Sequence, residues 1–303
     1  YYMNFADAHN LLSYRHTRAH NTLLVDGIGQ PFSTKAYGNI VRMLGGEHIS
    51  YALGDASSAY CGISEYPMWI RNFANQQLEQ SVENGFGETP LTLYRRHIFL
   101  LHPDKVLIYD EMEAEKPVRW DWLLHSPVQF SIGEEAKRLI TRNEEKQFTA
   151  VAQLFSQQDC KLTQTDRFVA PPDEKKAVRG EVLNNQWHLT ASFTPCKRNR
   201  ILTLIQVNAD GTKAVEIVRD GNHFQCGDWS IEAELDTRKP ACLYISNAVN
   251  HATFSYGKPS LLIGGKLYKL VHRESSLLFD KIKGEWQVQE MADRKPQLTG
   301  SNQ

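Results

Sequence analysis

The residues with the greatest capacity for chemistry lie near the start of the chain, where His16 and His20 are four positions apart. Asn21 and Thr22 follow, and after an apolar triplet comes Asp26-Gly27, a dipeptide that favours a tight turn. Neutral imidazole is the commonest metal-ligand side chain, and Asn, Thr and Asp can orient such a ligand through hydrogen bonds. The stretch therefore predicts a polar site that leads into a β-strand.

Two imidazoles four positions apart also occur in zinc-binding helices of the His-Glu-x-x-His type. The glutamate of that pattern is absent after His16, and strand-like sequence follows His20. One imidazole cannot form a closed zinc site, and nothing in the spacing requires Asp7, His9 or His16 to complete one. From the residues alone, His20 is either a metal ligand or a hydrogen-bonded loop histidine.

The elements that must position this stretch are β-strands. Segments with period-two alternation recur along the chain between Gly, Asn, Asp and Pro, and helical periodicity is nearly absent. Segments 91–101 and 105–110 flank His102-Pro103-Asp104 and predict a β-hairpin. The other predicted strands are 23–25, 50–53, 118–125, 148–155, 187–193, 201–207, 214–218, 229–235, 241–245, 252–256, 267–272 and 286–288. This pattern indicates an all-β fold, a large antiparallel sandwich of several sheets.

Length and charge set further bounds. The chain has 303 residues, so it can form one large domain or two lobes. The polar segment 166–181 predicts an exposed loop between a lobe at 1–165 and a lobe at 182–303. A net charge of -1 gives no general attraction for a polyanion, so nucleic acid is not an expected partner and contacts to an acidic ligand need a local basic patch.

Several classes of protein lack support in the sequence. There is no run of 18 apolar residues, so no membrane span is expected, and the chain opens without a signal peptide or an initiator Met. We therefore expect it to be a piece of a longer protein. The GxSxG, P-loop and GxGxxG motifs are absent, which argues against serine hydrolases and nucleotide-binding enzymes that carry them.

One stretch carries a family resemblance. The run from His20 to Gly27, followed by Gln30, resembles the signature of the heparinase II/III-like polysaccharide lyases, in the part that follows their helical toroid. The segments 54–60, 95–101, 105–110 and 122–125 resemble later blocks of that family, in the same order. The resemblance implies the C-terminal β-sandwich portion of such a lyase, without the N-terminal α/α toroid.

The resemblance also implies an activity and a set of site residues. Such lyases cleave uronic-acid-containing polysaccharides, of the glycosaminoglycan or alginate type, by β-elimination, and they are periplasmic or secreted. Their main acid and base lie upstream, which leaves Tyr14 as the candidate catalytic residue here and Arg18 and Asn21 as candidate substrate-binding residues. The histidine of the His-Asn-Thr motif binds zinc in that family, so the resemblance assigns a metal role to His20, with partner ligands expected from the upstream toroid portion.

Other polar residues have simpler explanations. Asp55 follows a glycine and is typical of a turn. The histidines on or beside predicted strands need only hydrogen-bond partners, and the arginines are interpreted as solvated surface charges. These residues are His97, His102, His125, Arg15, Arg95 and Arg96.

The alternative function is a carbohydrate-binding or structural sandwich module without catalysis. Exposed aromatic side chains would serve it by stacking on sugar rings. Tyr66, Trp69 and Trp120 are the candidates, although the period-two strand around Trp120 favours a place in the core.

Overall fold

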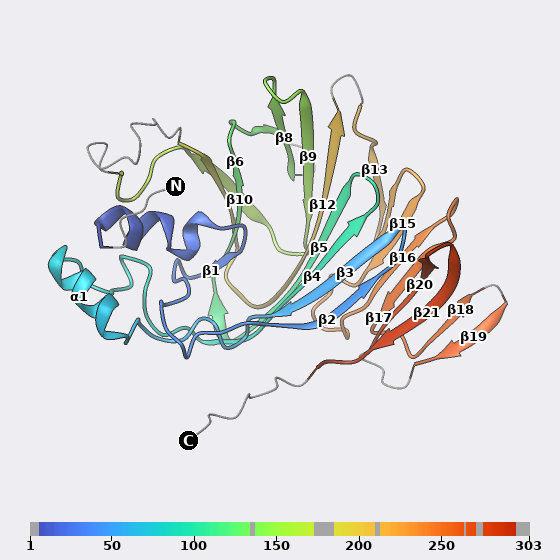
Figure 1. Cartoon of the computed structure of the whole chain (residues 1–303), viewed down its shortest axis with the longest axis horizontal. Coiled ribbons are helices and arrows are strands. Elements are labelled where there is room, and N and C mark those ends of the chain that lie inside the picture. Colours follow the sequence, from blue (N-terminus) through green and yellow to red (C-terminus); the bar gives the residue numbers. More distant parts are fainter. Residues whose placement is uncertain are drawn as a thin grey trace.

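Three large antiparallel β-sheets form the body of the protein (Figure 1). The computed structural model describes residues 6–133, 137–172, 185–209, 213–263, 265–270 and 275–294. Within these residues, no helix is long and apolar enough to cross a membrane. The predicted all-β, multi-sheet sandwich is confirmed.

We name the sheets by their position. The lateral sheet has the order β1 (Leu23–Val25), β6 (Trp120–Ser126), β11 (Trp187–Phe193), β10 (Cys160–Thr165). The central sheet has the order β2 (Asn39–Gly45), β3 (Ile49–Asp55), β4 (Leu91–Leu101), β5 (Lys105–Val118), β12 (Cys196–Ala209), β9 (Phe148–Phe155), β8 (Arg138–Asn143), β7 (Ser131–Gly133). The C-terminal sheet has the order β13 (Ile217–Asp220), β14 (His223–Cys226), β15 (Trp229–Ala233), β16 (Leu243–Asn247), β17 (Thr253–Tyr256), β20 (Ser276–Ile282), β21 (Glu285–Met291). A separate hairpin joins β18 (Ser260–Ile263) and β19 (Lys266–Lys269).

The central sheet is apolar on both faces, so it packs against a sheet on each side. Successive side chains of a strand point to opposite faces. Phe99 of β4 and Leu107 of β5 therefore join the core with the C-terminal sheet. Tyr94 and Met112, on the other face of the same strands, join the core with the lateral sheet, in which Trp120 and its neighbours are buried.

A short helical layer lies beside the lateral sheet (Figure 1). It contains the π-helix η1 (Asn10–Tyr14), the 3-10 helix η2 (Thr17–Ala19) and the α-helix α1 (Pro67–Asn75). The sequence predicted neither the helical turns before β1 nor α1. Trp69 and Phe73 lie four positions apart on α1, both are buried, and both pack in a small core with Phe86. Because α1 has only nine residues, its period is too short to stand out in the sequence.

The strand predictions were right for most of the chain. The hairpin of β4 and β5 is confirmed, and β5 and β12 run further than predicted. The predicted strand 214–218 was wrong at its start, because β13 begins at Ile217. Residues 271–272 of the predicted strand 267–272 lie outside the described residues, as do residues 173–181 of the predicted loop 166–181. Strands on either side of that loop share sheets, since β11 pairs with β6 and β12 pairs with β5 and β9.

Candidate functional site

Polar residues from four separate sequence blocks meet where the lateral sheet packs on the central sheet. We call Asn21, Arg96, Asp110, Trp122 and His125 the motif cluster. They come from the segment before β1 and from β4, β5 and β6. Residues of this cluster that contact one another are up to 104 positions apart in the sequence, so only the fold brings them together.

A buried ion pair forms the base of the motif cluster. Arg96 and Asp110 are direct neighbours across β4 and β5. The Arg96 guanidinium donates from Nε to Oδ1 at 2.7 Å and from Nη2 to Oδ2 at 2.9 Å, a two-point contact. The Trp122 indole N–H also donates to Oδ2, at 3.1 Å. Burial lowers the pKa of Arg96, but Asp110 more than offsets this and raises it, so the guanidinium stays charged.

This ion pair fixes the backbone of Asn21, and His125 fixes its side chain. Arg96 Nη1 donates to the Asn21 carbonyl oxygen. Asn21 Oδ1 accepts from the backbone N–H of His125 at 2.9 Å and lies 2.9 Å from His125 Nδ1. Because a backbone N–H can only donate, the Oδ1 position is assigned by this contact. The Asn21 amide nitrogen is therefore left as a donor on an exposed residue.

His125 has a second contact and a histidine neighbour. Its Nε2 lies 3.0 Å from the carbonyl oxygen of Arg18. Its direct cross-strand neighbour is His188 of β11, and the two rings meet edge to face at 4.6 Å. Burial, and then His188, lower the pKa of His125 to about 4. The interpretation of His125 as a histidine with ordinary hydrogen bonds was too narrow, because it orients a candidate substrate-binding residue.

Sequence reasoning missed His188. Its Nε2 is buried, and within the described residues no group is placed for a well-formed hydrogen bond to it. Burial lowers the pKa of His188, and the Arg18 carbonyl and Asp166 partly oppose this effect. The alternation in 187–193 predicts that His188 lies on the opposite face from Leu189, but only the register with β6 pairs it with His125.

His16 is a structural residue. It is fully buried and caps η2, because its Nδ1 accepts from the backbone N–H and from Nε of Arg18, at 3.1 and 3.0 Å. Nε2 must therefore carry the proton that it donates to the carbonyl of Gly85, at 3.0 Å. Burial is the main reason that its pKa is lowered to about 3. Gly85 has φ +87, and a Cβ there would lie 2.6 Å from His16 Nε2, so this position needs glycine.

The other predicted site residues occupy different settings. His20 is exposed at the end of η2, directly before Asn21. Arg18 is held in place, because its Nη2 donates to the Asn84 carbonyl at 2.7 Å and its Nε contacts His16. Tyr14 is 39% exposed at the end of η1, and none of the described contacts joins it to the motif cluster. The structure thus groups Arg18, His20 and Asn21 but not Tyr14.

The described residues do not fit a closed zinc site at His20. Among them, no group of three or more His, Cys, Asp or Glu side chains is arranged to hold a metal ion. His16 uses both ring nitrogens in hydrogen bonds, and His9 Nδ1 lies 2.7 Å from the carbonyl of Ala170. Asp7 Oδ1 accepts from the backbone N–H of Asn10 at 2.8 Å.

Two of the three aromatic candidates for sugar stacking are buried. Trp120 has no exposed surface, and it lies in the core between the lateral and central sheets. Trp69 is 8% exposed, and the Arg15 guanidinium lies over its ring at 4.8 Å. The core position favoured for Trp120 is confirmed, whereas the stacking role of Trp69 was wrong, because its ring packs in a small core. Tyr66 is 57% exposed.

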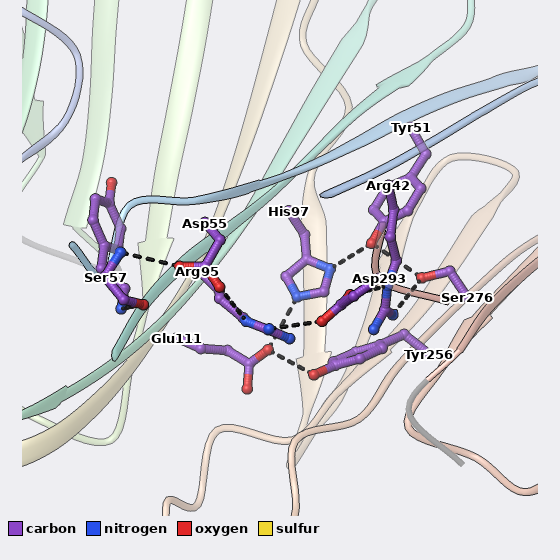
Figure 2. A network of polar contacts seen from close by, with 11 residues as sticks. Arg42, Tyr51, Asp55, Ser57, Arg95, His97, Glu111, Tyr256, Ser276 and Asp293 are labelled. Atoms are coloured by element: carbon purple, nitrogen blue, oxygen red, sulfur yellow. Dashed lines mark hydrogen bonds and ion pairs between the residues drawn. The ribbon is translucent and has the colours of Figure 1, made fainter. Parts of the chain in front are cut away.

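A second polar group lies between the central and C-terminal sheets, and Figure 2 shows it from close by. Its hydrogen bonds form a directed chain. Arg42 Nη1 donates to Ser276 Oγ, which donates to the Tyr51 hydroxyl, both at 3.1 Å. The Tyr51 hydroxyl must then donate to His97 Nδ1, at 3.0 Å, and His97 Nε2 donates to Glu111 Oε1, at 3.0 Å. We call these residues, with Tyr256, the inter-sheet network.

The neighbouring charges in Figure 2 form a ladder of ion pairs. Asp293 accepts from Arg42 Nε at 2.6 Å and from Arg95 Nη2 at 2.7 Å. Arg95 Nε donates to Asp55 at 3.0 Å, and Asp55 also accepts from the backbone N–H of Ser57, as a turn-forming aspartate does. The interpretation of Arg95 and Arg96 as solvated surface charges was wrong, because each pairs with carboxylates across strands.

Comparison with known proteins gives a family and a fold. A sequence profile of the family described as heparinase II/III-like, C-terminal, matches residues 2–254. Heparan sulfate lyase HepC from Pedobacter heparinus superposes with a TM-score of 0.49 and 15% identity, over 86% of this chain and 31% of that chain. A heparinase III gene product superposes with a TM-score of 0.50 and 13% identity, over 84% of this chain and 31% of that chain. The chain thus spans about a third of these solved structures. A search of curated proteins found no match.

Proposed function

Because the chain belongs to the heparinase II/III-like C-terminal family, we propose that it is the β-sandwich portion of a polysaccharide lyase. Its substrate would be a uronic-acid-containing polysaccharide of the glycosaminoglycan or alginate type, cleaved by β-elimination. The upstream α/α toroid would supply the main acid and base, so this portion alone would be inactive. The protein would act in the periplasm or outside the cell.

The observation that carries this proposal is the way Asn21 is held. Its Oδ1 is occupied by His125, and its backbone carbonyl is occupied by the charged Arg96. Asn21 is exposed, and none of the hydrogen bonds among the described residues uses its amide N–H₂ group. A donor fixed in advance suits a substrate carboxylate, because no reorganisation is needed when charge develops there.

The chemistry follows from what β-elimination requires. A base removes the proton beside the uronate carboxylate, and an acid protonates the leaving glycosidic oxygen. Hydrogen bonds to the carboxylate stabilise the negative charge that builds up as the proton leaves. We assign this last role to Asn21, with Arg18 as a neighbouring contact to the saccharide. Tyr14 is the proton-transfer candidate within this chain, and it would reach the substrate only in the assembled enzyme.

The test compares this chain with the same chain joined to its upstream toroid. Unsaturated uronate absorbs in the ultraviolet, so turnover of heparan sulfate, chondroitin sulfate and alginate can be followed directly. We expect activity on one of them only in the longer protein, and an Asn21→Ala version should lose about 100-fold in kcat/KM. Steady turnover by the 303-residue chain would refute the assignment of the main acid and base to the toroid.

The metal role of His20 is a separate proposal. A closed zinc site would need ligands from the toroid portion, because the described residues supply no complete set. Elemental analysis of the longer protein and of its His20→Ala version tests this. Stoichiometric zinc in the first and its loss in the second are expected, whereas equal zinc in both would remove the role from His20.

A further inference from the structure

A polar pocket opens at the end of the central sheet, on the face that carries the inter-sheet network. Its volume is about 280 Å³, and a second hollow of about 570 Å³ shares part of its wall. The ends of β4, β5 and β12 form one side, and the loop 237–240 between β15 and β16 forms the other. The two hollows share the wall residues Glu113, Arg198 and Thr237, so they lie side by side, and we call them together the trough.

Four cationic side chains line the pocket, and one of them, Arg200, is held in place by hydrogen bonds. Arg200 donates from Nη1 to the carbonyl oxygens of Glu234 and Asp236, at 3.3 and 2.9 Å, and from Nη2 to the carbonyl of Lys239, at 2.8 Å. These contacts tie the covering loop to β12. The other three cations, Arg198, Arg238 and Lys239, are exposed at the rim.

The acceptor at the inner end of the pocket is Glu111, which is 6% exposed. Its Oε1 accepts from His97 and from the Tyr256 hydroxyl, each at 3.0 Å. Figure 2 shows the other carboxylate oxygen turned away from this network. Burial raises the pKa of Glu111, but the hydrogen bonds from His97 and Tyr256 and the charge of Arg200 outweigh it and lower the pKa, so the group is an ionised acceptor.

This set of groups matches one kind of ligand. A buried carboxylate accepts from sugar hydroxyls, whereas guanidinium and ammonium groups at the rim bind an anionic substituent. Each exposed cation at the rim already pairs with a carboxylate, Arg198 with Glu113 at 2.7 Å, Arg238 with Asp236 at 2.8 Å and Lys239 with Glu234 at 3.5 Å. Exposed ion pairs of this kind are weak, so the anionic group of a sugar can replace these carboxylates at the cations, whereas a trough with balanced charges does not suit a dense polyanion.

We propose that this trough is a second saccharide-binding site, which holds an acidic sugar residue with its hydroxyls on Glu111 and its anionic group between Arg238 and Lys239. The choice of a sugar over another hydroxy acid rests on the proposed function. The site is separate from the motif cluster, because Glu111 and Asp110 are consecutive on β5 and point to opposite faces of the central sheet. It would hold a polysaccharide chain, or a released product, away from the cleavage point.

Titration calorimetry on the 303-residue chain tests the proposal, with sodium glucuronate, glucose and sodium sulfate as the probes. We expect saturable glucuronate binding and affinities about tenfold weaker for both glucose and sulfate, because each lacks one half of the recognition. Equal binding of sulfate would show a simple anion site and overturn the assignment of a sugar. Absence of saturable glucuronate binding would overturn the site altogether.

Variants locate the binding. A chain with Arg238→Gln and Lys239→Gln changes only exposed side chains, so it should fold normally and bind glucuronate about tenfold more weakly. Lys161→Gln, on an exposed position of β10 in the lateral sheet, is the matched control and should bind as the parent does. An unchanged affinity in the double variant would place the sugar elsewhere. Because no turnover is measured, this outcome is independent of the lyase proposal.

Discussion

The motif cluster and the inter-sheet network are built from consecutive residues of the same two strands, yet they differ in kind. Arg96 and Asp110 face the lateral sheet, where they form a buried ion pair. His97 and Glu111, one position further along each strand, face the C-terminal sheet, where they end a directed chain of hydrogen bonds. The motif cluster positions the exposed Asn21, and the inter-sheet network ends at Glu111 in the wall of a pocket.

A sheet that is covered on both faces can hold two separate polar groups, one on each face. Alternation alone decides that neighbours on β4 and β5 point in opposite directions. The contacts of each side chain depend on which sheet, the lateral or the C-terminal one, packs against its face. The lateral face leaves Asn21 exposed to solvent, whereas the other face holds its polar groups between two sheets and places Glu111 in the wall of a pocket.

The largest effect should come from breaking the ion pair of the motif cluster. Asp110→Ala leaves the largely buried Arg96 guanidinium without its carboxylate partner, and removal of one member of a buried pair costs about 3–5 kcal/mol of unfolding free energy. Urea denaturation measures this loss. Arg198→Ala breaks an exposed pair and should leave the urea midpoint unchanged. Equal effects of the two substitutions would contradict the burial argument.

A smaller loss is expected in the inter-sheet network. His97→Ala removes one of the two donors to Glu111 Oε1 and leaves the Tyr51 hydroxyl without its acceptor. The unfolding free energy should fall by about 1–3 kcal/mol, because Tyr256 still satisfies the carboxylate. A loss as large as that of Asp110→Ala would mean that the Tyr256 hydroxyl alone does not satisfy the buried Glu111 carboxylate.

Acid should lower the stability of the folded protein through His16. Its pKa is lowered from 6.5 to about 3, so between these values the unfolded chain binds a proton that the folded protein excludes. The stability is therefore complete above pH 6.5 and falls as the pH is lowered toward 3. From pH 6.5 to 5 the expected loss is about 2 kcal/mol. Urea midpoints at several pH values measure it, and His16→Gln should flatten the slope in this range.

Asn21→Ala should change the stability least, although Asn21 has the largest role in the proposed function. Asn21→Ala removes an exposed side chain whose Oδ1 accepts from His125, so it should cost about 1 kcal/mol or less. The same substitution should greatly lower the activity of the longer enzyme. A large loss of stability would instead make Asn21 a structural residue, and the lost activity would then carry no information about substrate binding.

Parts of this site could be predicted from the sequence because the signals are local. The His20-Asn21-Thr22 motif, the β4–β5 hairpin and the alternation of polar and apolar residues all depend on residues near one another in the chain. Arginines in ion pairs were not predictable, because a charged residue in an alternating strand has the same pattern whether water or a carboxylate lies opposite. Arg95 and Arg96 were misjudged for this reason.

The sequence by itself determined that the chain is all-β, which residues of each strand share a face, and that a polar segment leads into the first strand. Tertiary structure alone decided that Arg96 supports Asn21, that His188 lies beside His125, and that the loop 237–240 covers a pocket over Glu111. The physical reason is distance along the chain. Propensity and periodicity act over a few residues, whereas strand order, register and the stacking of sheets join residues more than a hundred positions apart, such as Tyr256 and Glu111.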